Sequence, residues 1–352
     1  MNTNYNFNQL GERLSSKLTV NYENYLYFGG TAYLGIPQNK EFIDIYTEGI
    51  QRYGLNNGTS RGNNVQLAIY DEAEAHAAKI YGAETALITS SGYLAAKLTV
   101  RAFAKFGAIR YAPNSHPALW LDGDPINHKE FKTWSKKLVA EINGSEEENW
   151  VVLSNSLNNL YPEIYDFSFV NHINSNKNIL LIIDDSHGIG IISGGFCAMQ
   201  SVPKLPNVEV IVIASMAKAL GVDAGLVLGS EGSVSKLKQS DEFYGASPPA
   251  AAGLYAFING QDIYKKAYKK LQTNVKLFEQ LLPCDSNWIN TDGFPVFLNR
   301  EKDIEQRLLE EKILISSFPY PDRNGSILNR IVLSSWHEEV DILKLITALQ
   351  FE

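Results

Sequence analysis

The sequence predicts an α/β fold with a mostly parallel sheet, and two observations lead to this expectation. Between Thr85 and Ser230, short apolar runs alternate with helical patterns, as in a sheet whose strands are joined by crossover helices. Two of the runs, 180–183 and 208–214, are almost entirely apolar, which is typical of parallel strands buried on both faces. The chain has 352 residues, enough for one large and one small domain.

The first part of the chain is expected to form an arm and the beginning of the large domain. Residues 1–48 start with polar residues, continue with aromatic ones and contain Gly29, Gly30 and Pro37, which interrupt regular structure. Beyond this arm, the spacing of apolar residues and the positions of turn residues predict helices at 41–53 and 67–80 and a strand at 86–89.

The same patterns predict the elements that follow. Strands are expected at 109–111, 151–153, 180–183, 208–214 and 226–228, with helices at 128–143, 166–173, 231–244 and 250–282. The C-terminal region predicts strands at 294–298, 313–316 and 327–334, with helices at 304–311 and 338–349. We therefore expect an arm at 1–48, a large domain at 49–265 and a small α/β domain at 266–352.

Composition and charge exclude several classes of function. The net charge is -8 and no polybasic run is present, so neither nucleic acid nor a membrane surface is an expected partner. Residues 1–17 contain no apolar run and no stretch reaches transmembrane length, so neither secretion nor membrane insertion is expected. Its two cysteines, Cys197 and Cys284, are too few for a disulfide framework and lack the spacing of metal ligands. A cytoplasmic protein without a metal is the expectation.

One lysine is expected between two buried strands. Lys218 follows the run 208–214 and precedes the run 226–228, with Gly221 and Gly225 turning the chain between them. A lysine held there is costly unless its pKa is lowered or it is bonded covalently. A Schiff base to an aldehyde cofactor would remove this cost. The alternative is that Lys218 only ends a loop.

Polar residues also follow the neighbouring apolar run. Asp184 and His187 lie at the carboxyl end of 180–183, where open α/β sheets bind their ligands. A carboxylate at this place can keep a pyridine nitrogen protonated, which makes the ring an electron sink. Asp184 could instead cap a turn before Gly188, and the residues alone leave both roles open.

A third candidate is the strand–turn–helix at Ser91-Gly92-Tyr93. The helix that begins there offers free N–H groups to a phosphate. Gly92 allows close approach of the backbone, and Ser91 can add a hydroxyl. Ser91 could also serve only as an N-cap.

Together these motifs resemble a known family. The segments GTSRG at 58–62, DDSHG at 184–188 and SMAKALG at 215–221 stand in the order found in the α-oxoamine synthases, which are fold-type I pyridoxal-phosphate (PLP) enzymes. The resemblance runs from about Tyr33 to the C-terminus. It implies a large PLP-binding domain with a mostly parallel seven-stranded sheet, a small C-terminal α/β domain, and a homodimer with shared active sites.

The resemblance also implies roles for particular residues. Lys218 would bond the cofactor aldehyde, Asp184 would contact the pyridine nitrogen, His116 would stack on the ring, and His187 would hydrogen-bond the phenolic oxygen. The cofactor phosphate would be held by Ser91, Gly92, Tyr93 and Ser215 and, across the dimer interface, by Ser247. The substrate would contact Arg330 and Tyr33. An arginine can hold a carboxylate through two parallel hydrogen bonds. The sequence departs from the family pattern at Ala32, Ala96, Ser115, Ala118, Tyr244 and Gly245.

The function implied is that of a PLP-dependent acyltransferase. An α-amino acid would condense with an acyl thioester of coenzyme A or acyl carrier protein, lose CO2 and give an α-amino ketone. L-Alanine and a pimeloyl thioester, as in biotin synthesis, are the first expectation. An aminotransferase of the same fold needs the same lysine, aspartate and arginine and stays open. A catalytically silent partner subunit is a third possibility, against which the retained Lys218 argues.

Overall fold

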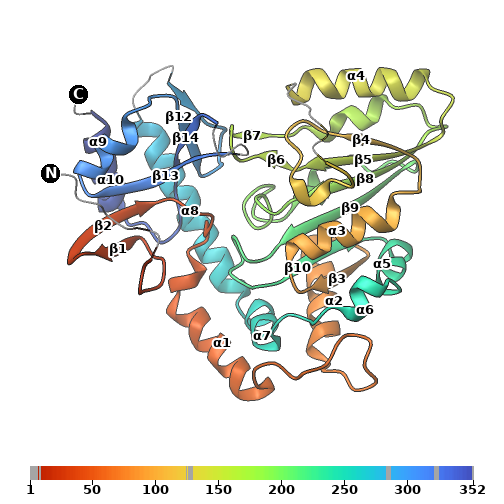
Figure 1. Ribbon diagram of the computed structural model, residues 1–352, viewed down its shortest axis with the longest axis horizontal. Helices are drawn as coiled ribbons and strands as arrows, with labels where there is room; N and C mark the ends of the chain where they lie inside the picture. The colour runs from red at the N-terminus through yellow and green to blue at the C-terminus, as the bar shows by residue number, and fades with distance from the viewer. Residues whose placement is uncertain are drawn as a thin grey trace.

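The computed structural model describes residue 7 and residues 9–123, 125, 130–282, 287–320 and 325–350. Cys284 and the expected start of the 128–143 helix lie outside the described residues, whereas Cys197 is a buried free thiol. Within these ranges no helix combines the length and apolar character needed to cross a bilayer. Two six-stranded sheets organise the chain (Figure 1).

The larger group of expected strands forms one sheet in the order β3-β10-β9-β8-β5-β4. Strands β4, β5, β8 and β9 run parallel, and β10 is antiparallel to both of its neighbours. Their bounds are β3 (Thr85–Thr89), β4 (Ala108–Tyr111), β5 (Asn149–Asn155), β8 (Asn178–Asp184), β9 (Val208–Ser215) and β10 (Gly225–Gly229). The predicted mostly parallel sheet is confirmed, with six strands in the described residues where seven were expected.

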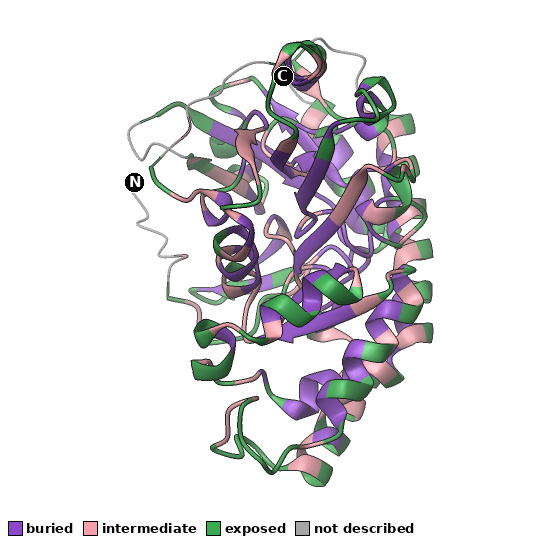
Figure 2. Cartoon of the chain, turned by 90° about the vertical axis from the view of Figure 1, so that its right-hand side faces the viewer, coloured by how far each residue is buried: buried purple, intermediate pink, exposed green. Residues whose placement is uncertain are grey.

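Alternate residues of each central strand face opposite layers of helices, because side chains of a strand alternate between its two faces. Leu180 and Ile182 of β8 pack with residues of α3 and α5, whereas Leu181 and Ile183 belong to the larger core with α2 and α7. Figure 2 shows these strands buried and the exposed positions on the outer surfaces of the helices. The helix bounds are α1 (Lys40–Tyr53), α2 (Ile69–Tyr81), α3 (Gly92–Phe103), α4 (Phe131–Gly144), α5 (Glu231–Lys238) and α7 (Ala251–Asn259).

Three helix predictions differ from the structure in detail. The expected helix 231–244 is two helices, α5 and α6 (Asp241–Gly245), because the Ser240 side chain accepts from the Phe243 N–H and starts a new helix. The expected helix 250–282 breaks at Gly260 into α7 and α8 (Gln261–Leu281). The segment expected as a helix at 166–173 is the 3₁₀-helix η3 (Phe167–His172).

The second sheet joins the two ends of the chain, in the order β1-β2-β13-β14-β12-β11. Strand β2 pairs in parallel with β13, so part of the expected N-terminal arm is a strand pair built onto C-terminal strands. Figure 1 shows this red and blue sheet beside α8 and α10. The bounds are β1 (Lys17–Val20), β2 (Glu23–Phe28), β11 (Trp288–Ile289), β12 (Val296–Asn299), β13 (Ile313–Pro319), β14 (Ile327–Val332), α9 (Ile304–Glu310) and α10 (Glu339–Gln350).

A buried histidine ties β2 to the C-terminal segment. The Nδ1 atom of His337 accepts from the Ser334 N–H at 3.0 Å, and its Nε2 lies 2.9 Å from the Tyr27 carbonyl oxygen. The ring stacks on Phe28 at a centroid distance of 4.2 Å. With Nδ1 accepting, Nε2 of the neutral ring carries the proton and donates to the Tyr27 carbonyl, and the indole nitrogen of Trp336 lies 3.1 Å from the same Nε2. The imidazole is therefore held neutral, and its burial lowers its pKa to about 4.

Candidate active site

A cavity of about 680 Å³ opens at the carboxyl ends of the parallel strands and extends toward the second sheet. It is lined by most of the residues predicted from the sequence: Ser91, Gly92, Tyr93, His116, Asp184, His187, Ser215, Lys218 and Arg330. Tyr33 and Ser247 are not among the lining residues; Tyr33 is buried behind the cavity and Ser247 is exposed. The fold thus brings together nine of the predicted residues from five separate segments.

Lys218 lies in the loop between β9 and β10. Hydrogen bonds from the Met216 N–H to the Ala224 carbonyl and from the Val222 N–H to the Met216 carbonyl close this loop. Gly221 has φ +63°, and a side chain there would meet Ile36. Burial lowers the pKa of the Lys218 amine, while the carboxylate of Asp184 acts in the opposite direction. A lysine whose pKa is lowered in this way is more readily available as a nucleophile or base.

Asp184 ends β8 and lines the cavity. Its Oδ1 accepts from the Ser186 N–H at 3.0 Å, and the Ser186 hydroxyl in turn accepts from the Ser215 N–H at 2.8 Å. The carboxylate therefore caps the turn and also faces the cavity, and its contact with a pyridine nitrogen stays a prediction. This bonding fixes the Asp184 carboxylate relative to the loop that carries Lys218.

His116 is placed by a network in its own loop. It precedes the 3₁₀-helix η2 (Pro117–Leu119), and its Nδ1 accepts from the Ala118 N–H at 3.2 Å. Its own N–H donates to Asn155 Oδ1 at 3.0 Å. Ser115, one of the departures from the family pattern, accepts from the Trp120 indole N–H with both its carbonyl and hydroxyl oxygens. The altered neighbours thus still hold this loop.

The N-terminus of α3 has the features that anion sites use. The Ser91 hydroxyl accepts from the Leu94 N–H at 3.2 Å and is a true N-cap. The N–H groups of Gly92 and Tyr93 have no partner within the helix. A Cβ at Gly92 would lie 2.6 Å from Ser215 backbone and side-chain atoms, so only glycine fits. The end of α3 can therefore receive a phosphate close to Ser215.

Arg330, on β14, brings a cation to the opposite wall of the cavity. It is 5% exposed, and its Nη1 donates to the Asn159 carbonyl at 2.9 Å. The guanidinium carbon lies 5.0 Å from the centre of the Phe318 ring. Its Nε has no hydrogen-bond partner among the described residues. A buried donor of this kind indicates an anionic ligand such as a carboxylate.

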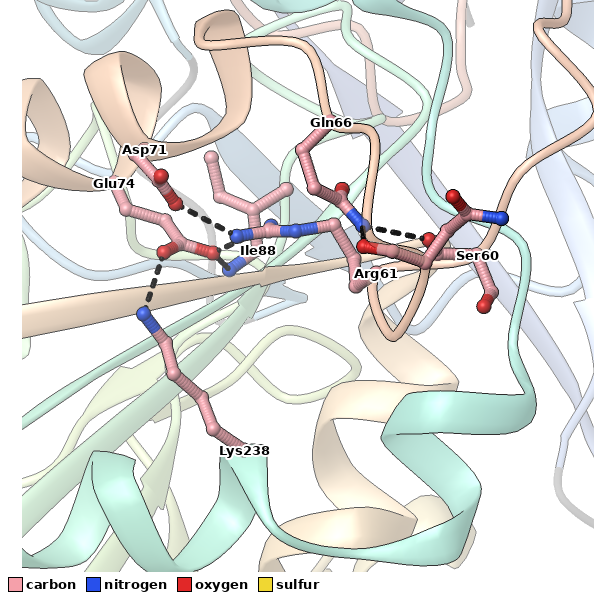
Figure 3. A network of polar contacts seen from close by, with 8 residues as sticks. Ser60, Arg61, Gln66, Asp71, Glu74, Ile88 and Lys238 are labelled. Carbon is pink, nitrogen blue, oxygen red and sulfur yellow. Dashed lines mark hydrogen bonds and ion pairs between the residues drawn. The ribbon is translucent and has the colours of Figure 1, made fainter.

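An ion cluster that was not predicted from the sequence anchors the GTSRG loop (Figure 3). Glu74, on α2, is 4% exposed and accepts from Arg61, Lys238 and the Ile88 N–H at 2.8–3.1 Å. Arg61 also contacts Asp71 at 3.0 Å. The sequence did contain a sign of this cluster, because Glu74 lies within the apolar stripe of its helix. A carboxylate buried at such a position must be paired with a cation or a hydrogen-bond donor.

Aromatic residues of the cavity were also missed. Trp120, Tyr161, Phe318 and Tyr320 line it. Tyr161 lies between β6 (Leu157–Asn158) and β7 (Glu163–Ile164), and the last two lie at the end of β13 or just beyond it. They are separated widely in the sequence and belong to no shared pattern, so only the fold could group them.

Comparisons with known proteins agree with this architecture. The family described as aminotransferase class I and II matches residues 24–349. A Methanococcus aeolicus protein provisionally named 8-amino-7-oxononanoate synthase is 27% identical, covering 95% of this chain and 91% of that protein. The 8-amino-7-oxononanoate synthase of Paraburkholderia phymatum is 23% identical over 95% of this chain and 90% of its own.

Solved structures show the same fold. The serine palmitoyltransferase of Sphingomonas wittichii superposes with a TM-score of 0.81 at 16% identity, covering 97% of this chain and 90% of its own. The 8-amino-7-oxononanoate synthase of Francisella tularensis gives a TM-score of 0.71 at 18% identity, covering 92% and 96%. The expected fold type is confirmed.

Proposed function

Because the chain belongs to the class I and II aminotransferase family, we propose that it is a PLP-dependent acyltransferase of the α-oxoamine synthase type. The predicted resemblance to that group is confirmed by the named relatives. The reaction is the decarboxylative condensation of an α-amino acid with an acyl thioester. The observation that carries the proposal is the convergence of Lys218, Asp184 and Arg330 on one cavity.

The residues present fit the cofactor. The amine of Lys218 has a lowered pKa in the cavity, a carboxylate faces it from Asp184, and free N–H groups lie beside Gly92. These groups would hold, respectively, the aldehyde, the pyridine nitrogen and the phosphate. When bound, the cofactor ring supplies an electron sink that stabilises a carbanion at Cα of the amino acid.

Each side chain then has a definite task. Arg330 holds the carboxylate of the amino acid through its unpaired donors and so orients Cα. Lys218 removes the Cα proton as a general base, which its lowered pKa favours. His116 would lie against the cofactor ring, and His187 would donate to its phenolic oxygen. Ser91, Tyr93 and Ser215 would complete the phosphate site, with Ser247 of a second subunit as a further donor.

The finer assignments extend the proposal. L-Alanine and a pimeloyl thioester of coenzyme A or acyl carrier protein are the proposed substrates, supported by the names of the relatives. A homodimer in the cytoplasm is proposed as the working form. We also retain the division into an arm at 1–48, a large domain at 49–265 and a small domain at 266–352.

Spectroscopy of the purified protein with PLP tests the proposal. A visible band that borohydride fixes onto Lys218, absent in Lys218→Ala, is the expected result. Thioester-dependent CO2 release from an amino acid would then identify the synthase reaction. Amino-group transfer without CO2 would instead identify an aminotransferase, and no band in wild type would indicate a silent subunit.

A further inference from the structure

The segment that contains Tyr33 is fixed to the chain just beyond β14. The Ser335 N–H donates to the Tyr33 carbonyl at 2.9 Å, and the Ser334 hydroxyl donates to the Ala32 carbonyl at 2.7 Å. Gly35 has φ +59°, and a Cβ there would lie 3.0 Å from the Trp336 nitrogen. The backbone around Tyr33 is therefore held in place by the segment that follows β14.

From this position Tyr33 reaches a cavity residue that lies 154 positions away in the sequence. Its hydroxyl lies 2.9 Å from Nδ1 of His187, and its side chain is 1% exposed. His187 lines the cavity. No atom of the described residues is hydrogen-bonded to the second ring nitrogen, Nε2, which is therefore available to a ligand.

The direction of this hydrogen bond follows from the partners available. Burial raises the pKa of Tyr33, so its hydroxyl keeps its proton. If Nδ1 of His187 carried a proton and donated, the Tyr33 proton would be buried without an acceptor among the described residues. A buried donor without an acceptor is strongly unfavourable. The hydroxyl therefore donates to Nδ1, and the imidazole proton lies on Nε2.

The surroundings of His187 keep its ring neutral. Burial lowers its pKa well below the usual value, and the cationic groups of Lys218, Arg330 and, when protonated, His116 act in the same direction. Burial and the nearby cationic groups thus keep the imidazole of His187 uncharged. What remains for Tyr33 to determine is which ring nitrogen carries the single proton.

We infer that Tyr33 is a positioning residue that fixes His187 as the Nε2–H tautomer and thereby presents a hydrogen-bond donor to the cofactor ring. The part concerning the cofactor rests on the proposed function. This role differs from the substrate contact that the family resemblance implies for Tyr33. A hydrogen bond from Nε2–H stabilises the ionised phenolic oxygen of the cofactor, so the tautomer influences the ring's electronic state.

The first test uses the cofactor-free protein. Its six histidines are labelled with ¹⁵N, and His187→Asn identifies the resonances of His187 by their loss. We expect the Nε2–H tautomer in wild type. In Tyr33→Phe the ratio of the tautomers should change about 2- to 10-fold, the equivalent of one hydrogen bond. Tyr70→Phe, which removes the buried hydroxyl bonded to the Pro249 carbonyl, should leave the ratio unchanged.

The second test uses the protein loaded with PLP. In Tyr33→Phe the visible band should change its pH dependence, and kcat should fall about 2- to 10-fold while the KM for the amino acid stays the same. A rise in KM alone would instead make Tyr33 a substrate contact and overturn the inference.

The outcomes separate this inference from the proposed function. An Nδ1–H tautomer in wild type would overturn the inference without any variant, so it can be judged even if Tyr33→Phe does not fold. An unchanged tautomer ratio in a folded Tyr33→Phe would also overturn it. A wild-type protein that takes up no PLP would refute the proposed function while the tautomer assignment stands.

Discussion

Replacing Glu74 with glutamine should destabilise the protein far more than a change at its neighbour Asp71. Both carboxylates bind the same guanidinium, that of Arg61, but the Glu74 side chain is 5% exposed and that of Asp71 is 79% exposed (Figure 3). Glutamine preserves the shape of Glu74 and can still accept from the Ile88 N–H, so the main change is the loss of charge. Arg61, itself 8% exposed, then keeps only the exposed partner.

The magnitude follows from the burial of each group. Removing one partner of a buried ion pair costs about 3–5 kcal/mol. Asp71 still contacts Arg61, and Lys238 is 40% exposed and can regain water, so we expect about 3 kcal/mol for Glu74→Gln. Asp71→Asn breaks an exposed pair and should cost less than about 1 kcal/mol. In the double variant Arg61→Met/Glu74→Gln, the loss should be smaller than the sum of the single losses.

Urea unfolding measures these differences. The five tryptophans report by fluorescence, and far-UV circular dichroism gives an independent probe; coincident transitions justify a two-state free energy. Raising the salt concentration to about 1 M should reduce the Asp71 effect and leave the Glu74 effect nearly intact. Equal losses for Glu74→Gln and Asp71→Asn, within about 0.5 kcal/mol, would refute the view that burial makes Glu74 the anchor.

Three further predictions test the cavity and the second sheet. Gly92→Ala should weaken PLP binding by about 1–3 kcal/mol, because the new Cβ meets Ser215 at 2.6 Å; Gly144→Ala, with no atom near its Cβ position, should bind PLP normally in the same absorbance titration. Arg330→Lys keeps the charge but loses the planar fork, so the KM for the amino acid should rise about 10-fold or more in steady-state kinetics, and an unchanged KM would remove Arg330 from the carboxylate site. The pKa of His337 is about 4 in the folded protein and about 6.5 in the unfolded chain. Between these two pKa values the unfolded chain binds more protons than the folded protein. The free energy of unfolding should therefore fall by about 3 kcal/mol as the pH drops from 7 to 4. The variant His337→Gln should lose less free energy of unfolding over that pH interval, as measured by urea unfolding at each pH. A loss equal to that of the wild type would contradict the assignment of this pH dependence to His337.

The sequence predicted the elements whose signals are local. The apolar run before Asp184 and the Ser91 cap each appear within a few residues, and both are where they were expected. Gly260 was also a local signal, but the helical periodicity continues across it and hid the break between α7 and α8. Where a pattern extends over a break, spacing alone cannot locate the boundary.

What the sequence could not show depends on pairing between distant segments. The contact of Tyr33 with His187 spans 154 positions, and no periodicity encodes such a pair. The strand β2 was missed because its partner β13 lies at the other end of the chain, and β1 joins the sheet only through β2. Glu74 was overlooked because its partners, Arg61 and Lys238, lie in two other segments that only the fold brings to it.

The pairing of β2 with β13 also has a consequence for how the chain is made. Glu23 and Lys312, which connect β2 to the start of β13, are 289 positions apart, so β2 is synthesised long before its partner strand β13. The strands of the large sheet lie between residues 85 and 229 and find their partners earlier. Synthesis therefore leaves the outer edge of the β1–β2 hairpin exposed until β13 emerges, and a chain truncated before Ile313 would lack the strand that β2 pairs with.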